Sequence, residues 1–146
     1  MTTLYKTKGM AMRFQRAFTL IELMLALMIA AILTSLAYPA YIDHETQAER
    51  LRAEVALMQL AAQLEVYFSD NNSYDGATIH SLHVAMLMQG LDYRLKIAKA
   101  SDMHYLIRAI PKNSQAERDT DCEILSLSDT NKRGISGDGS VNACWR

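Results

Sequence analysis

The sequence predicts an α+β protein in which one long N-terminal helix packs on a small antiparallel sheet. Three observations support this fold class. An apolar run broken by a single acid lies near the N-terminus, an amphipathic helical pattern follows it, and short alternating segments separated by turn residues fill the C-terminal part. A chain of 146 residues has room for one globular domain beside such a helix.

The segment 18–42 predicts a membrane-spanning helix. At 1.5 Å per residue it covers roughly 37 Å, more than the roughly 30 Å hydrocarbon core of a bilayer. Pro39 removes a backbone hydrogen bond, so we expect a kink near it. The four cations before Phe18 orient the N-terminus to the cytoplasm, which places residues 43–146 outside the inner membrane. A conventional cleaved signal peptide would have a shorter apolar region.

Glu22 is the only charged residue between Phe18 and Ala37. Its carboxylate lies about one turn inside the membrane, where it can reach the headgroups, and the helix N-terminus favours an anion there. Alternatively, it pairs with a cation supplied by another copy of the chain. The residue pattern alone leaves both interpretations open.

The helical pattern becomes amphipathic after Tyr41. Two stripes at helical spacing predict one broad apolar face that packs on the sheet. They are Leu51, Val55, Met58 and Ala62, and Leu57, Leu60, Leu64 and Phe68. Turn-forming residues from Ser69 to Asn72 predict the end of the helix. A helix from Phe18 to Phe68 is longer than a soluble core of this size needs, so its first half must pack in lipid or against sister helices.

The segment after the helix predicts four strands in series, which favours an antiparallel sheet. We expect them near residues 93–98, 105–111, 122–127 and 132–136, with a short helical turn within 81–89. From residue 18 onward, 11 Lys and Arg stand against 16 Asp and Glu, a net charge of −5. A basic head, an apolar run and an acidic body are typical of a membrane-targeted chain rather than a nucleic-acid binder.

No residue pattern predicts catalysis, a cofactor or a metal. His80 and His83 lie three residues apart, on one face if this segment is helical, but two histidines are weak evidence for a metal. Asp119, Asp121 and Asp138 lack the spacing of an EF-hand loop, so we expect them to be surface acids. There is no phosphate-binding glycine motif. The sequence gives no support for enzyme activity.

The N-terminal stretch "FTLIELM", after a short basic leader, resembles the processing and assembly signal of type IV pilins and pseudopilins. "AYPAY" places Pro39 where such pilins carry a kinking proline, and "NNSYDGAT" resembles the end of their helix and the following loop. "CEILSLSDTNKRGISG" followed by "CW" resembles the last strands and disulfide-bounded loop of minor pilins. The resemblance spans nearly the whole chain.

The resemblance implies that residues 1–17 are a leader, which a prepilin peptidase removes between Ala17 and Phe18 before the Phe18 amine is methylated. Glu22 would then pair with the Phe18 amine of a neighbouring subunit in the filament. The sequence departs from the family pattern at Ala17, where glycine is preferred, and at Ala31, where many members have a mid-helix glycine.

The cysteines Cys122 and Cys144 would form an intramolecular disulfide outside the membrane, whereas in the cytosol they would be free thiols. The pilin resemblance implies the former. Lys132, Arg133 and Arg146 could meet beside Trp145 near this loop, which makes DNA a weakly supported partner.

The function implied is that of a structural subunit, a minor pilin of a type IV pilus (fimbrium), for adhesion, twitching motility or DNA uptake. Its partners would be other pilin subunits, the prepilin peptidase, the inner-membrane assembly platform and, before assembly, membrane lipid. The alternatives are a pseudopilin of a type II secretion system and a monomeric membrane-anchored binding module.

Overall fold

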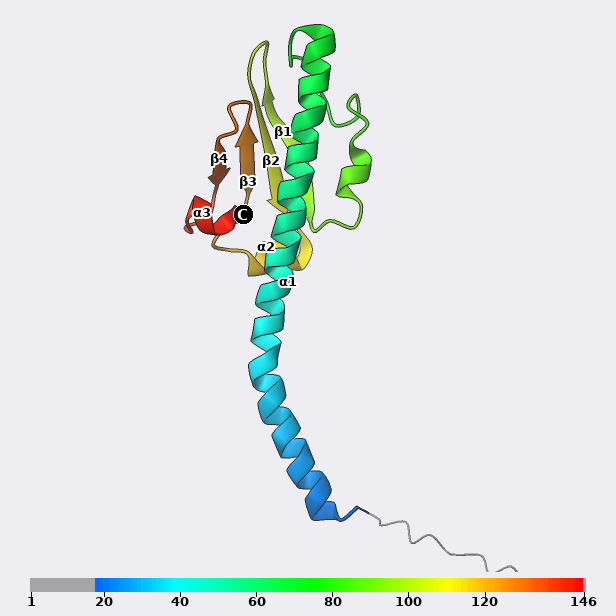
Figure 1. Ribbon diagram of the computed structural model, residues 1–146, viewed down its shortest axis with the longest axis vertical. Helices are drawn as coiled ribbons and strands as arrows, with labels where there is room; N and C mark the ends of the chain where they lie inside the picture. Colours follow the sequence, from blue (N-terminus) through cyan, green and yellow to red (C-terminus); the bar gives the residue numbers. More distant parts are fainter. Residues whose placement is uncertain (1–17, 146) are drawn as a thin grey trace, which may run out of the picture. The chain divides into compact units, whose positions relative to one another are not determined.

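The computed structural model describes residues 18–145 (Figure 1). The chain divides into two compact units at Pro39 and Ala40. The described part of the first unit is the beginning of helix α1 (Leu20–Asn71), and the second unit contains the rest of α1 and all of the sheet.

Helix α1 begins after a cap at Thr19 and includes Pro39 in its interior. The hydroxyls of Thr34 and Ser35 donate to carbonyl oxygens one turn earlier, so they are satisfied within the apolar segment. The helix ends at Asn71, and Asn72 adopts a left-handed conformation while its N–H donates to the Phe68 carbonyl over 2.7 Å. The predicted helix end is therefore confirmed, whereas the kink at Pro39 stays a prediction.

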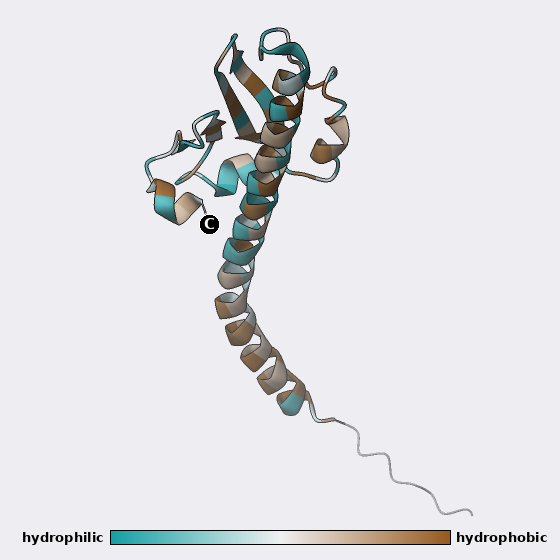
Figure 2. Cartoon of the chain, turned by 45° about the horizontal axis from the view of Figure 1, so that its top comes forward, coloured by the Kyte–Doolittle hydropathy of each residue, from teal (hydrophilic) through white to brown (hydrophobic). Residues whose placement is uncertain are grey.

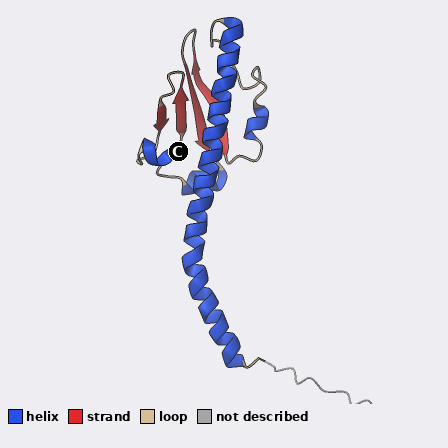
Figure 3. Ribbon diagram, in the orientation of Figure 1, coloured by secondary structure: helices blue, strands red, loops and turns tan. Residues whose placement is uncertain are grey.

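A four-stranded antiparallel sheet follows in the order β1-β2-β3-β4 (Figure 3). The strands are β1 (Tyr93–Ala100), β2 (Tyr105–Pro111), β3 (Leu125–Ser128) and β4 (Arg133–Ile135). They confirm the predicted sheet, although β3 begins later than expected. The predicted helical turn is the 3-10 helix η1 (Ala85–Met88), whereas α2 (Asn113–Arg118) and α3 (Val141–Cys144) were not anticipated.

The core lies between one face of the sheet and the second half of α1. Leu57, Leu60 and Leu64 are fully buried in one cluster with residues of the sheet such as Tyr93 and Ile107. The expectation that both apolar stripes of the helix pack on the sheet is wrong. Residues of the first stripe remain exposed: Leu51 49%, Val55 47% and Met58 42%. At 100° per residue the two stripes lie on opposite sides of the helix, and the sheet covers only one of them.

Candidate functional site

The first half of α1 presents apolar side chains without any cover. Helix α1 is long and apolar enough to cross a membrane by length and composition, and none of its most apolar window is buried. Every large apolar side chain from Phe18 to Leu36 is at least 51% exposed. In Figure 2 the ribbon of this segment is coloured as hydrophobic along most of its length. Such a surface needs lipid or other protein around it.

Glu22 lies in the first turn of α1 and contacts the cap residue. Its backbone N–H donates to Thr19 Oγ1 over 3.4 Å, and the Thr19 hydroxyl donates to Glu22 Oε2 over 3.5 Å. The Thr-x-x-Glu spacing is that of a capping box, a motif that can be read directly from the sequence. The carboxylate is thus held four residues after Phe18, close to the end of the helix.

A buried polar network holds helix α2 against α1 and β1. Arg50 of α1 donates through Nε and Nη2 to the two carboxylate oxygens of Asp119, and Tyr93 donates its hydroxyl to Asp119 Oδ2 over 2.6 Å. The side-chain amide of Gln115 donates to the Thr46 carbonyl and to Asp119 Oδ2, each over 3.1 Å. Every polar atom of Asp119 therefore has a partner, which a buried carboxylate requires.

This network corrects the expectation that Asp119 is a surface acid, because its side chain is fully buried beside Arg50, whose side chain is 14% exposed. Burial opposes the charge on Arg50, but the hydrogen bonds and the negative charge of Asp119 outweigh it, and the pKa of the guanidinium is raised. Burial, and then the hydrogen bond to Asp119, raise the pKa of Tyr93. Sequence reasoning missed this pair because its members are 69 residues apart.

Cys122 and Cys144 are joined in a disulfide, as expected. The bond ties α3 to the segment before β3. The glycines of the enclosed loop allow close approach of backbones: a Cβ at Gly139 would lie 2.7 Å from the Asp121 carbonyl oxygen, and one at Gly137 would clash with the same peptide. The Gly139 N–H donates to that oxygen over 2.8 Å. The loop is therefore packed, and larger residues would force it open.

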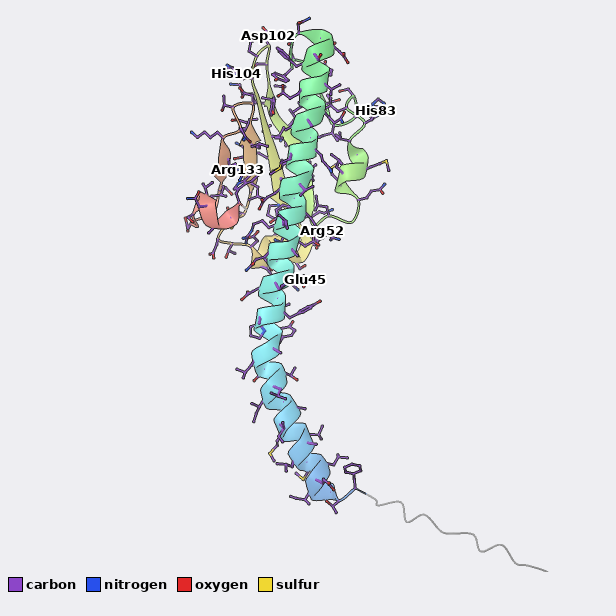
Figure 4. The ribbon with its side chains drawn as sticks, in the orientation of Figure 1. Glu45, Arg52, His83, Asp102, His104 and Arg133 are labelled. Carbon is purple, nitrogen blue, oxygen red and sulfur yellow. A yellow bond between two sulfur atoms is a disulfide. The ribbon has the colours of Figure 1, made fainter. Side chains whose placement is uncertain are left out.

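Two of the three cations proposed for DNA contact, Lys132 and Arg133, lie in the described part of the chain, close in sequence to β4. The guanidinium of Arg133, which is labelled in Figure 4, lies 5.3 Å from the centre of the Trp145 ring, a cation–π contact. Trp145 is only 4% exposed, and its Nε1 donates to the Gly134 carbonyl. The ring is therefore not available for base stacking. Lys132 is exposed, and Arg146 lies outside the described residues, as does Ala17.

No group of three His, Cys, Asp or Glu side chains in the described part of the chain could hold a metal ion. His80 and His83 lie in turns rather than on a helix, with ring centres 6.5 Å apart. A polar hollow of about 450 Å³ lies beside the disulfide, lined on one side by Asp43 and Arg50 and on the other by Asp121. Of its charged lining residues, Arg50 is paired with Asp119 and Arg118 is paired with Glu45.

The model of the family described as "Type IV minor pilin ComP, DNA uptake sequence receptor" matches residues 39–126. The chain belongs to this family of type IV minor pilins. The prokaryotic N-terminal methylation motif matches residues 12–38. Members of the pilin class are structural subunits that are processed by a prepilin peptidase and assemble into filaments, and the motif together with the apolar helix indicates membrane anchoring.

The pilin fold is also that of a solved minor pilin. The structure of the non-core minor pilin PilV of Neisseria meningitidis matches with a TM-score of 0.52 and 19% identity, covering 64% of this chain and 89% of that one. At this identity the likeness concerns the fold alone.

Curated relatives come from type II secretion. Core protein G of Pectobacterium carotovorum subsp. carotovorum is 37% identical over 60 residues, which is 41% of this chain and 38% of that protein. Core protein G of Dickeya chrysanthemi is 36% identical over 62 residues, 42% and 40% of the two chains. The pilin thus spans about two fifths of the length of these relatives. They fit the pseudopilin alternative, but the minor-pilin match extends over β1 and β2.

Proposed function

We propose that this pilin is inserted in the inner membrane with its N-terminus in the cytoplasm, is cleaved after Ala17, and polymerises through α1 into a pilus. The Phe18 amine, methylated after cleavage, would pair with Glu22 of a neighbouring subunit. Membrane lipid, the prepilin peptidase and the inner-membrane assembly platform are its partners before assembly. In the pilus it would serve adhesion, twitching motility or DNA uptake.

The observation that carries this proposal is the exposure of apolar side chains along the whole of α1. Before Pro39 they surround the helix and suit both lipid and a bundle of sister helices. Within the second unit, Leu51, Val55, Met58 and Val66 of α1 are also exposed. A lone membrane anchor has no need of these exposed apolar side chains in the globular unit, whereas a filament subunit can bury them against its neighbours.

Glu22 gives the sharpest test of assembly. In cells with intact pilus machinery, Glu22→Gln should insert into the membrane normally and lose its leader, but its amount in sheared surface filaments should fall severalfold. Without the negative charge the amine of the neighbour stays unpaired in an apolar bundle. Glu45→Gln is the matched control, because it removes a carboxylate from the same helix where that carboxylate pairs with Arg118.

The fractions are read by mass measurement of the N-terminus and by immunoblotting. Full incorporation of Glu22→Gln would contradict the docking role of this acid. A wild-type chain that keeps residues 1–17 and stays in the inner membrane would support the anchored binding module instead. A secretion defect with normal surface filaments on deletion would support the pseudopilin.

A second function, binding of double-stranded DNA, is favoured by the family description, which names a DNA uptake sequence receptor. Lys132, Arg133 and Arg146 remain candidate contacts, with Arg133 already engaged by Trp145. A gel-shift measurement with the full chain in neutral detergent should show binding that weakens as salt rises. A salt-insensitive signal, or none, would remove this function and leave the filament role untouched.

A further inference from the structure

Three side chains that can bind soft metal ions follow one another along a short surface segment. Residues 80–88 read HSLHVAMLM, which places His80, His83 and Met86 three residues apart. The segment contains a turn at 79–83, closed by the His83 N–H donating to the His80 carbonyl over 3.1 Å, and then the 3-10 helix η1. None of the three side chains belongs to the hydrophobic core.

His80 and His83 are close enough to share one metal ion. Their ring centres lie 6.5 Å apart, and the ring planes are inclined by 33°. Two imidazole nitrogens that bind one ion from opposite sides, each at about 2 Å, bring the ring centres to roughly 6 Å from each other. Both side chains are exposed, so a small rotation of either ring meets no packed neighbour.

Met86 can supply a third ligand. It lines the same hollow as His83, beside α1, and this hollow has a volume of about 520 Å³. The side chain of Met86 is 75% exposed, although methionine is among the residues most often buried. In Figure 4 the labelled His83 lies on the side of α1 opposite to Arg133. The thioether is therefore open to an ion held at the edge of this hollow.

The three donors are uncharged, which selects the ion. Among residues 18–145, no third His, Cys, Asp or Glu completes a metal-binding group with the two histidines. Zn²⁺ is usually held by three or four such ligands, and Ca²⁺ by six or more oxygen atoms, so neither ion fits. A methionine thioether favours Cu(I), and imidazole also binds copper. A monovalent ion needs no carboxylate to neutralise it, and Cu(I) accepts two or three ligands.

We propose that His80, His83 and Met86 form a surface site for Cu(I). The two imidazoles bind the ion from opposite sides, and the thioether is the third and weaker ligand. Binding only forms coordination bonds, and the ion stays Cu(I) throughout. The inference goes beyond the proposed filament role and does not depend on it, because the ligands all come from one segment of one chain.

The test measures Cu(I) binding by the full chain in neutral detergent, without oxygen and with ascorbate present. The ion is supplied as its coloured complex with bicinchoninate, whose absorbance falls as the protein removes Cu(I). His80→Gln/His83→Asn removes both imidazoles, and asparagine tolerates the left-handed backbone of His83, where φ is 53°. His44→Gln/His104→Gln is the matched control, since it removes two exposed histidines from α1 and from the β1–β2 connection.

The thioether is tested by a second pair of variants. Met86→Leu removes the sulfur and keeps an apolar side chain of similar size, and Met103→Leu is the control at another exposed methionine, 62% exposed. X-ray absorption of the bound copper reports whether sulfur is among its neighbours. Every variant keeps the methionines of residues 1–58, so any copper that they bind is common to all samples.

The loss of one supporting group beside a metal ligand already weakens binding 10–100-fold, so the loss of both imidazoles should weaken it by more than about a hundredfold. Met86→Leu should weaken Cu(I) binding by about tenfold and remove a sulfur neighbour from the spectrum. Both controls should leave the affinity and the spectrum unchanged.

Cu(I) binding that survives in His80→Gln/His83→Asn, or that falls equally in the histidine control, would overturn the site. An unchanged sulfur signal in Met86→Leu would overturn the role of the thioether. Binding of Zn²⁺ through the same histidines, with Cu(I) left on bicinchoninate, would overturn the choice of ion. Equal melting temperatures without copper show that lost binding is not lost fold; if the histidine variant melts lower, the affinity and spectrum of Met86→Leu decide.

Discussion

Replacing Asp119 by asparagine should destabilise the globular unit severely without altering its shape. The carboxylate is fully buried and accepts hydrogen bonds from Arg50, Tyr93 and Gln115. Asparagine keeps one acceptor oxygen but replaces the other by a donor that faces the guanidinium. Arg50 would be left as a largely buried charge without a counter-ion.

Removing one partner of a buried ion pair costs about 3–5 kcal/mol. Because the side chain of Arg50 is 14% exposed and adjoins a polar hollow, we place the loss near the lower limit, about 3 kcal/mol. For a unit of this size that lowers the melting temperature by roughly 10–20 °C. A loss of about 3 kcal/mol is a large part of the unfolding free energy of a typical domain, roughly 5–15 kcal/mol.

Thermal unfolding followed by near-ultraviolet circular dichroism measures the loss. Glu45→Gln breaks the exposed pair with Arg118 and should cost less than about 1 kcal/mol. In the double variant Arg50→Met/Asp119→Asn the buried charge is gone, so its loss should be smaller than the sum of the single losses. The reasoning is refuted if Asp119→Asn melts no lower than Glu45→Gln, or if the two single losses simply add.

Three further perturbations test other parts of the structure. Arg108→Glu should raise the free energy of unfolding by about 0.5 kcal/mol, since it turns the repulsion with Lys96 into attraction; a urea titration that shows a decrease would contradict this. Reducing the disulfide between Cys122 and Cys144, which are 22 residues apart, should lower the free energy of unfolding by about 3 kcal/mol. A melting temperature that reductant leaves unchanged would contradict this stabilising role. Burial, followed by the hydrogen bond to Glu65, raises the pKa of Tyr74 to about 12. The folded state therefore holds the neutral phenol, and stability present below about pH 10 should decline as the pH rises toward 12. Thermal melts across this range should show less decline in Tyr74→Phe, and an equal decline in both proteins would refute the assignment.

The elements that sequence predicted well are those with local signals. The N-terminal apolar run, the turn-forming residues at Asn71 and Asn72, and the alternation in β1 and β2 each occupy a few neighbouring residues, and the structure follows them. The disulfide followed from the pilin resemblance and the expected compartment. These features depend on spacing and residue type, which a sequence displays directly.

What sequence reasoning missed depends on contacts between distant segments. No residue near Asp119 in the sequence indicates that Arg50 will neutralise it, so the local pattern predicts a surface acid. Likewise the exposed stripe of Leu51, Val55 and Met58 has the same apolar character as the buried one, and only the position of the sheet decides which of them is covered. The cross-strand meeting of Lys96 and Arg108 required the register of the sheet.

The Arg50–Asp119 bond also fixes alignment. Hydrophobic contacts between leucines are not directional, so they alone would allow α1 to shift along the sheet. The bidentate guanidinium–carboxylate pair forms in one relative position only. Displacement of α1 along the sheet by a single turn would leave both charges buried without a partner. In each copy of the chain, the exposed first stripe of α1 therefore has the same position and rotation relative to the sheet. Subunits of a helical filament need this uniformity, because each makes the same contacts with its neighbours.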